Sequence, residues 1–256
     1  MSRHIIIPDC QIRPGDDMSF LKCISNYIVD KKPDVIICLG DFADMPSLSS
    51  YDVGKKSFEG RKYTDDVKAA TDGMMYLTGG IHLERNRLET NKKKQWNPRM
   101  VLTLGNHEAR IDKAIENDRK LEGLISINDL DYSIFGWEVV PFLQPIVIDG
   151  IAYCHYMCSG VMGRAITTSR ALITKKHMSC IVGHQQGRDV AYSHKADGRQ
   201  MTAIIAGSCY EHEEGYLNAQ TNNHWRGIVM LNEVNEGSFD ECFISLNYLK
   251  NKYGNK

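Results

Sequence analysis

The chain has 256 residues, 42% of them hydrophobic, which is enough to bury a sizeable core as one domain or as one domain with an insertion. The formal net charge of -1 excludes a strong attraction of the whole surface to polyanions, although a local basic patch is compatible with it. The apolar runs fall well short of the roughly 18 residues that span a bilayer.

The N-terminus and the cysteines together predict a cellular compartment. A secretory apolar segment is missing, because Pro8 and Asp9 directly follow the apolar run at residues 5–7. The eight cysteines form no Cys-x-x-Cys pair, and most lie inside apolar runs, where a small buried thiol is expected. We therefore expect a reduced, cytoplasmic protein without a membrane partner.

The N-terminal half alternates between predicted strands and helices. Met18, Leu21, Ile24 and Ile28 recur at helical spacing, and Gly79-Gly80 is expected to break a later helix in two. In chain order we expect a strand at residues 4–8, a helix at 17–30, a strand at 35–39, a loop at 45–63, helices at 64–77 and 81–88, a polar loop at 91–97, a strand ending at 104 and a helix starting near 107.

The C-terminal half is predicted to be mostly β. Short apolar runs are separated by turn residues such as Pro141 and Asp149-Gly150. A βαβα half followed by a β-rich half predicts an α/β sandwich. The expected strands are residues 137–140, 144–148, 151–155, 178–182, 190–193, 201–206, 227–231 and 242–246, with one helix at 161–175.

Five short segments carry side chains that bind metals, and each follows an apolar run. In an open α/β sheet, sites form just beyond the carboxyl ends of the strands, so we expect these segments to meet. A convergence of Asp, Asn, His and Gln side chains predicts a site for two metal ions. The segments are Asp9-Cys10-Gln11, Gly40-Asp41-Phe42-Ala43-Asp44, Gly105-Asn106-His107-Glu108, His155 and Gly183-His184-Gln185-Gln186.

These residues resemble the motifs of the calcineurin-like metallophosphoesterase superfamily. The family pattern runs Asp-x-His, Gly-Asp-x-x-Asp, Gly-Asn-His-Glu/Asp, a lone His and Gly-His-x-His, in this order. The match covers residues 9–186, and Gln11 and Gln186 stand where the family has its first and last histidine. The resemblance implies a four-layer αββα sandwich of two mixed sheets flanked by helices, formed by a single metallophosphoesterase domain over residues 1–256.

The resemblance also implies a role for each matched residue. Asp41 would bridge two divalent ions, which share the hydroxide that attacks the phosphorus. His107 would protonate the leaving group as a general acid, and Asp44 would orient His107. The implied metal ligands are Asp9, Gln11 and Gln186 for the first ion, Asn106, His155 and His184 for the second, and Asp41 for both.

Gln11 and Gln186 change the ligands of the first ion as a pair. A glutamine ligates through its amide oxygen, and oxygen ligands suit Mn²⁺ or Mg²⁺ better than Zn²⁺ or Fe. We therefore expect two divalent ions, Mn²⁺ before Mg²⁺, with Zn²⁺ and Fe disfavoured beside the glutamines. The alternative is that the first ion is lost and the protein works with one ion.

Three further groups of residues have two interpretations each. Arg110, one helical turn after His107, could reach a substrate phosphate or form a salt bridge. His212, His224 and Trp225 could belong to a substrate-recognition loop or could only pack. A basic cluster could follow a phosphate backbone, but a solvated helix end is favoured. This cluster consists of Arg85, Arg87, Lys92, Lys93, Lys94 and Arg99.

The second and third motifs bear on the substrate. Protein Ser/Thr phosphatases of this superfamily carry phosphate-clamping arginines where this chain has Met45-Pro46 and Leu104. The missing clamps favour a phosphodiesterase or nuclease, with nucleic acid and nucleotides as candidate phosphoester substrates. Two alternatives stay open: a phosphomonoesterase acting on a nucleotide or phosphoprotein, and a non-catalytic binding scaffold. The presence of both His107 and Asp44 argues against a scaffold.

Overall fold

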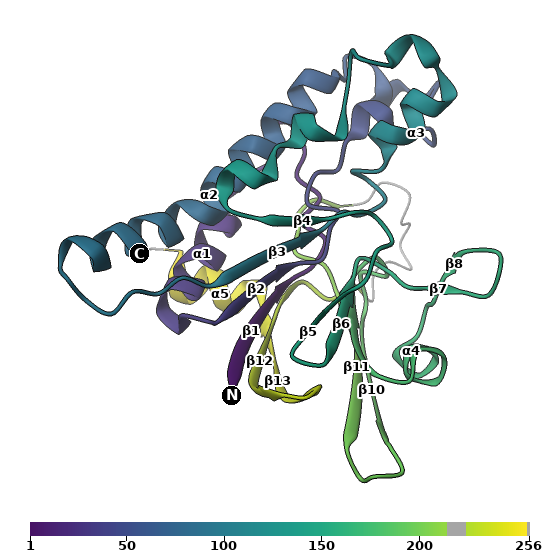
Figure 1. Cartoon of the computed structure of the whole chain (residues 1–256). Helices are drawn as coiled ribbons and strands as arrows, with labels where there is room; N and C mark the ends of the chain where they lie inside the picture. Colours follow the sequence, from purple (N-terminus) through teal and green to yellow (C-terminus); the bar gives the residue numbers. More distant parts are fainter. Residues whose placement is uncertain (214–223, 255–256) are drawn as a thin grey trace.

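Two mixed β-sheets, packed face to face, form the centre of the molecule (Figure 1). The computed structural model describes residues 1–213 and 224–254. The first sheet contains β1 (Ser2–Ile7), β2 (Val35–Cys38), β3 (Arg99–Thr103), β4 (Glu138–Val140), β12 (Gly227–Asn235) and β13 (Ser238–Ser245). Its order is β13-β12-β1-β2-β3-β4; β1 to β4 pair in parallel, and β12 pairs antiparallel with β1 and β13.

The second sheet has the order β10-β11-β9-β6-β5. Its two central pairs, β11 with β9 and β9 with β6, are parallel, whereas both outer pairs are antiparallel. A two-stranded ribbon, β7 (Cys158–Ser159) with β8 (Arg164–Ala165), lies outside both sheets. The strands of the second sheet are β5 (Ile146–Ile148), β6 (Ile151–Cys154), β9 (Ser179–Val182), β10 (Arg188–His194) and β11 (Gln200–Ala206).

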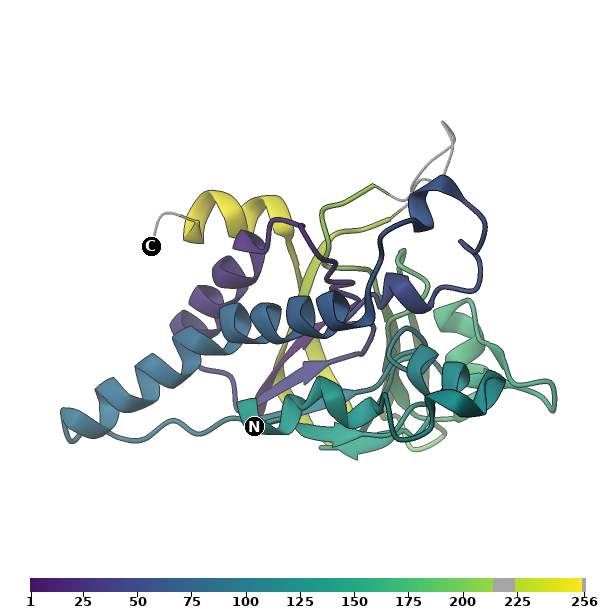
Figure 2. The same ribbon diagram turned by 90° about the horizontal axis from the view of Figure 1, so that it is seen from above.

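Helices cover the outer faces of both sheets. α1 (Ser19–Lys31), α2 (Tyr63–Thr90) and α5 (Leu246–Tyr253) pack on the first sheet, and α4 (Ser169–Lys176) packs on the second (Figures 1 and 2). Side chains along β1 alternate accordingly: Ile5 and Ile7 face the helices, and Ile6 faces the second sheet. The predicted α/β fold class is therefore confirmed, as a four-layer αββα sandwich.

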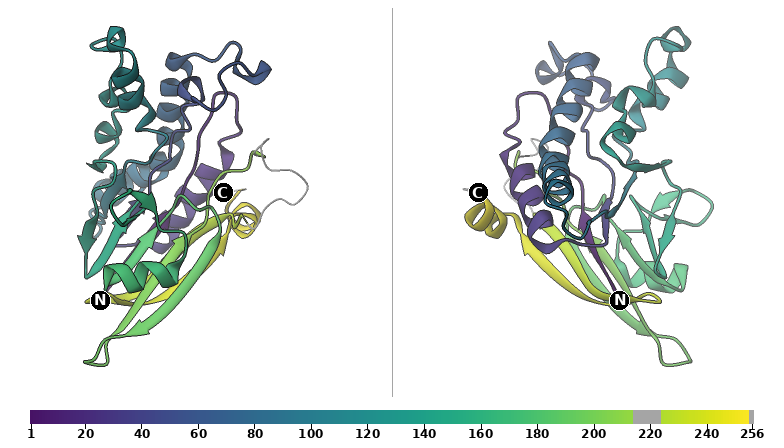
Figure 3. Two further views of the ribbon diagram at one scale, coloured as in Figure 1. Left: turned by 90° about the vertical axis from the view of Figure 1, so that its right-hand side faces the viewer. Right: turned by 60° about the vertical axis from the view of Figure 1, so that its left-hand side comes forward.

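Two helical segments project beyond the sheets at one end of the sandwich (Figure 3). They are the N-terminal part of α2 and the segment that runs from α3 (Arg110–Asn117) through 3₁₀ turns to residue 135. The Tyr63 hydroxyl joins the two parts by donating to Asp129 at 2.7 Å. Within the two described ranges, none of the helices combines the length and apolar composition needed to cross a bilayer.

The predicted break at Gly79-Gly80 is wrong, because α2 is one continuous helix. A Cβ atom at position 80 would lie 2.6 Å from the Ser25 hydroxyl of α1, so Gly80 allows the two helices to approach closely. The propensity cost of glycine inside a helix, about 1 kcal/mol, is therefore offset by packing.

Two further predictions for the C-terminal half need correction. The helix expected at residues 161–175 begins only at Ser169, since Gly160 and Gly163 have positive φ and form the β7–β8 turn. α5 was not predicted as a helix, although the Ser245 hydroxyl caps it by accepting from the Tyr248 N–H. The other predicted strands are present, with ends shifted by up to four residues.

Candidate metal centre and active site

The five predicted segments meet where strands of the two sheets end. Asp9 follows β1, Asp41 follows β2, His155 directly follows β6, and His184 follows β9. His155 Nε2 lies 3.2 Å from Asp41 Oδ2 and joins the two sheets at this point. Asn106 joins from the loop after β3, because its Oδ1 lies 2.9 Å from the same ring nitrogen.

The backbone at this junction is strained. Five of the predicted ligands have positive φ, a conformation that is costly for residues other than glycine and that clusters at functional sites. The five are Asp9, Gln11, Asp41, His184 and Gln186. Two glycines allow the loops to approach: a Cβ at Gly105 would lie 2.1 Å from Asp41 Oδ1, and one at Gly183 would lie 2.3 Å from Asp9 Oδ1.

The Nε2 atom of His155 faces two oxygen atoms, one on Asn106 and one on Asp41. Its Nδ1 lies 2.8 Å from the Leu39 carbonyl, to which it donates, so the neutral ring has its lone pair on Nε2. In the neutral ring that lone pair would face Asn106 Oδ1 and Asp41 Oδ2. Three acceptors in contact require a cation or a proton among them. Burial lowers the pKa of His155, but the carboxylates of Asp41 and Asp9 raise it to about 9.

His184 and Asp9 are arranged around the same point. Burial and the neighbouring His155 lower the pKa of His184 to about 4, so its ring is neutral and able to ligate. Ligating atoms of Asp41, His155 and His184 all lie within 4.8 Å of one another. Asp9 is fully buried and accepts the His184 backbone N–H at 3.0 Å; its burial raises the pKa of this carboxyl to about 7.

The two glutamines differ in their surroundings. Gln11 Oε1 is buried without a hydrogen-bond partner, whereas Gln186 Oε1 accepts from the Tyr210 hydroxyl at 2.7 Å. We call Asn106, His155 and His184 the histidine half of the site, and Asp9, Gln11 and Gln186 the glutamine half; Asp41, the predicted bridge between two ions, belongs to both.

His107 and Asp44, the predicted acid and its partner, are in contact. His107 Nδ1 lies 2.6 Å from Asp44 Oδ1, and Arg110 donates to His107 Nε2 at 3.0 Å. Arg110 also donates to the Asp44 carbonyl at 2.7 Å, and Arg13 forms an ion pair with the Asp44 carboxylate. Burial raises the pKa of Asp44, but His107 and the two arginines lower it to about 2. Arg110 Nη1 also lies 3.6 Å from Asp44 Oδ1, which is the salt bridge that was one of its two interpretations.

Glu108 organises two loops of the site, a role that was not predicted. Its fully buried carboxylate accepts three backbone N–H groups, from Asp41 at 2.9 Å, Ala43 at 2.9 Å and Gly105 at 2.8 Å. The second and third motifs are thereby fixed against each other. The only sequence feature that could have indicated this role is the position of Glu108 in the third motif, directly after His107.

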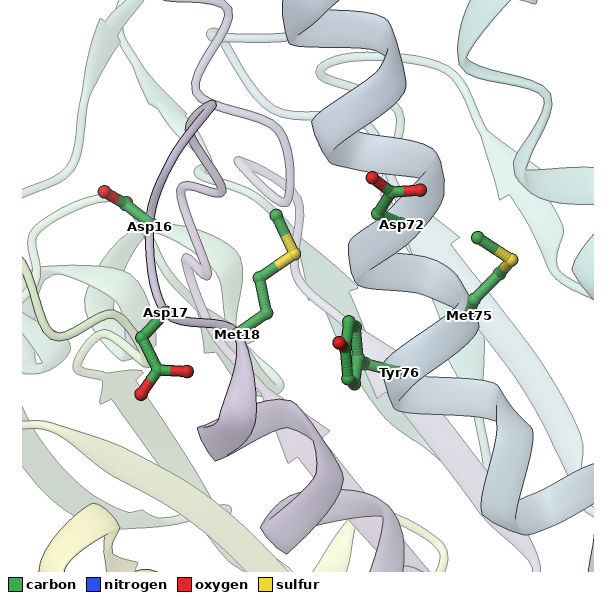
Figure 4. A pocket seen from close by; sticks show the side chains of 6 residues that line it. All are labelled: Asp16, Asp17, Met18, Asp72, Met75 and Tyr76. Carbon is green, nitrogen blue, oxygen red and sulfur yellow. The ribbon is translucent and has the colours of Figure 1, made fainter.

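A cleft of about 1080 Å³ opens over this cluster. Gln11, Asn106, His107, His184 and Gln186 line its floor, and the segment from Pro46 to Asp66 supplies much of its wall. A smaller groove of about 640 Å³, between the N-terminal end of α1 and α2, contains none of the predicted site residues (Figure 4). The cleft is therefore the place where a substrate could meet the predicted ligands.

Of the remaining candidate residues, His224 contacts a side chain of the site, whereas the basic cluster lies away from it. His224 reaches the site through Tyr210, whose hydroxyl is 3.2 Å from His224 Nδ1. His212 stacks on Tyr210, while Trp225 packs on Phe243. Arg99 opens β3, at the opposite end of that strand from Asn106, so the basic cluster lies away from the site. Arg87 and Arg99 in that cluster pair with Glu84 and Glu138.

The donor set suits divalent ions. A cation would satisfy the buried, unpartnered Gln11 Oε1, and it could replace the proton between His155 Nε2 and the oxygens that face it. Nitrogen ligands are confined to the histidine half, and the glutamine half offers oxygen atoms from Asp9 and Gln11. The residues present therefore fit the predicted kind of site.

No protein-family model matches the chain. The chain is similar to the Gene 54 protein of Mycobacterium phage L5, with 25% identity over 194 residues, which cover 71% of this chain and 68% of that protein.

Proposed function

We propose that the protein is a metal-dependent phosphoester hydrolase of the calcineurin-like metallophosphoesterase type, with phosphodiesters as its favoured substrates. The observation that carries this proposal is the convergence of Asp41 and Asn106 oxygen atoms on His155 Nε2, beside the His107–Asp44 pair. A divalent ion at this point would take the place of the proton that the raised pKa of His155 otherwise puts between these groups.

Each half of the site would hold one divalent ion. Asp41, Asn106, His155 and His184 would hold one, and Asp9, Gln11 and Asp41 would supply oxygen atoms to the other, for which Mn²⁺ is the best match. When bound, such ions neutralise phosphoryl oxygens and lower the pKa of water. Glu108 keeps the loops of Asp41 and Gly105 in place, whichever ions are present.

His107 would deliver the proton to the leaving oxygen. Asp44 faces its Nδ1 and stabilises the protonated ring, so Nε2 is the atom from which the proton leaves. In this structure Arg110 donates a hydrogen bond to His107 Nε2. We expect a phosphate oxygen of the substrate to bind at the position that the Arg110 guanidinium now occupies beside Nε2. When the phosphate binds, Arg110 would turn to it while keeping its bond to the Asp44 carbonyl.

The charges around the cleft favour a substrate with a single negative charge. Most basic side chains on its wall are paired, Lys55 and Arg61 with Asp52 and Arg13 with Asp44, and Lys62 adds one further positive charge. The unpaired positive charge that a phosphomonoester dianion would require is therefore small. A diester, such as a nucleic acid or a cyclic or linear nucleotide diester, matches this balance better.

A comparison of three substrates tests the proposal. The protein, freed of metal by chelation and reloaded with Mn²⁺, is assayed on bis-p-nitrophenyl phosphate, on p-nitrophenyl phosphate and on single-stranded DNA. We expect the diester to be hydrolysed faster than the monoester, and only after Mn²⁺ is added. A faster monoester reaction would favour the phosphomonoesterase alternative, and Mn²⁺ binding without hydrolysis of any substrate would favour the scaffold.

A further inference from the structure

Gln11 and Gln186 occupy equivalent places in the motif pattern but have opposite hydrogen-bonding needs. The buried Oε1 of Gln11 lacks a partner, so a cation or a donor must satisfy it when the site is complete. Gln186 Oε1 already has its donor, the Tyr210 hydroxyl at 2.7 Å. A glutamine binds a metal through its amide oxygen. This oxygen already accepts a hydrogen bond in Gln186 and accepts none in Gln11.

The side chain of Tyr210 is buried and its ring is packed by neighbouring side chains, which fixes the hydroxyl that donates to Gln186. The residue is 1% exposed, and its ring stacks on His212 with the centroids 4.2 Å apart and the planes at 12°. The Arg226 guanidinium lies 5.3 Å from the ring centroid on Tyr210, and it is itself fixed by two backbone carbonyls. Such a support orients the amide of Gln186 before any ligand arrives.

The amide nitrogen of Gln186 remains for a ligand in the cleft. Gln186 lines the cleft together with Asn106, His107 and His184. Within residues 1–213 and 224–254 its Nε2 has no hydrogen-bond partner. An amide nitrogen carries two protons and no lone pair for a metal, so it suits an anionic oxygen and repels a cation.

We propose that Gln186 binds the substrate and not a metal ion. Its Nε2 donates to a non-bridging oxygen of a phosphodiester, and Tyr210 is the positioning residue that directs it there. This inference rests on the proposed phosphoesterase function and replaces the predicted metal-ligand role of Gln186. Because the donor is neutral, it gains less from the second charge of a monoester than an arginine or a protonated histidine would.

The experiment separates metal binding from substrate binding. Mn²⁺ affinity is measured by calorimetry, and KM and kcat are measured on bis-p-nitrophenyl phosphate, for the parent and four variants. Gln186→Ala should leave the Mn²⁺ Kd within about twofold and raise KM about tenfold, which is the effect of one lost hydrogen bond. Gln11→Ala should instead weaken Mn²⁺ binding about tenfold. Tyr210→Phe should follow Gln186→Ala with a smaller rise in KM.

Gln185→Ala is the matched control, because this neighbouring glutamine does not line the cleft. It should change neither Mn²⁺ affinity nor KM. The inference is overturned if Gln186→Ala weakens Mn²⁺ binding as much as Gln11→Ala does, or if its KM equals that of the parent. A parent protein that neither binds Mn²⁺ nor hydrolyses the diester would overturn the proposed function as well, and this result differs from a failure of the Gln186 assignment alone.

Discussion

The histidine half and the glutamine half of the site share Asp41 but differ in how their donors are arranged. In the histidine half, His155 Nε2 faces Asn106 Oδ1 at 2.9 Å and Asp41 Oδ2 at 3.2 Å. In the glutamine half, Gln11 Oε1 lacks a hydrogen-bond partner, whereas Gln186 Oε1 accepts one hydrogen bond from the Tyr210 hydroxyl. The comparison teaches that two glutamines at matching motif positions can have different hydrogen-bonding surroundings. We expect the histidine half to bind its ion tightly and the glutamine half to bind weakly.

The largest effect is expected for Asp41→Asn, which removes the charge common to both halves. Metal binding and diester hydrolysis should both fall to the level of a protein-free sample, because both proposed ions would lose a carboxylate ligand. Metal content by mass spectrometry and product release are measured on the same preparation. Asp72→Asn, on α2 and outside the cleft, is the control and should keep both. Recovery of a metal-loaded, active Asp41→Asn protein would contradict the shared role.

His107→Ala tests the acid separately from both halves. Turnover of a diester with a poor leaving group should fall roughly 10²- to 10⁴-fold, since the leaving oxygen then lacks a proton donor. The loss should shrink for p-nitrophenolate, which departs with little help, and Mn²⁺ affinity should stay unchanged. Equal losses with both leaving groups would mean that His107 has a different role.

A matched pair of variants measures the difference between the halves. His155→Ala should weaken the tighter Mn²⁺ site at least about 100-fold, whereas Gln11→Ala should weaken only the other site, by about tenfold. Calorimetric titration of both proteins resolves the two affinities. If the two variants weaken the same site by the same factor, the division into halves is wrong.

The smallest effect concerns metal choice. After chelation, activity should return best with Mn²⁺, less with Mg²⁺ and poorly with Zn²⁺, because the glutamine half offers oxygen ligands. The double variant Gln11→His/Gln186→His should raise the activity supported by Zn²⁺ several-fold, and each single variant should do less, since the two positions are neighbours. An unchanged metal preference in the double variant would contradict the metal-ligand role of Gln11.

The sequence predicted the strands and the motif residues because their patterns are local. Runs such as Ile5-Ile6-Ile7 are continuous where both faces of a strand are buried, and the polar residues follow each run directly. The contacts that distinguish Gln186 from Gln11 are not local. Tyr210 lies 24 residues from Gln186 in sequence, and no spacing rule brings them together.

The errors in the predicted helices have the same origin. Gly79-Gly80 resembles a helix break, but whether it acts as one depends on Ser25 of α1, which packs against it. Residues 161–168 belong to a turn set by two glycines with positive φ and not to the helix that follows. In both cases tertiary packing or turn geometry overrode a pattern that was read along the chain alone.

The most direct test is a Mn²⁺ titration of the parent protein, with diester hydrolysis measured at every point. We predict one tight and one weaker Mn²⁺ equivalent, and hydrolysis of bis-p-nitrophenyl phosphate that rises as Mn²⁺ binds. A protein that binds no Mn²⁺ above the Asp41→Asn background, or that hydrolyses the diester equally well in the presence of excess chelator, would contradict the account.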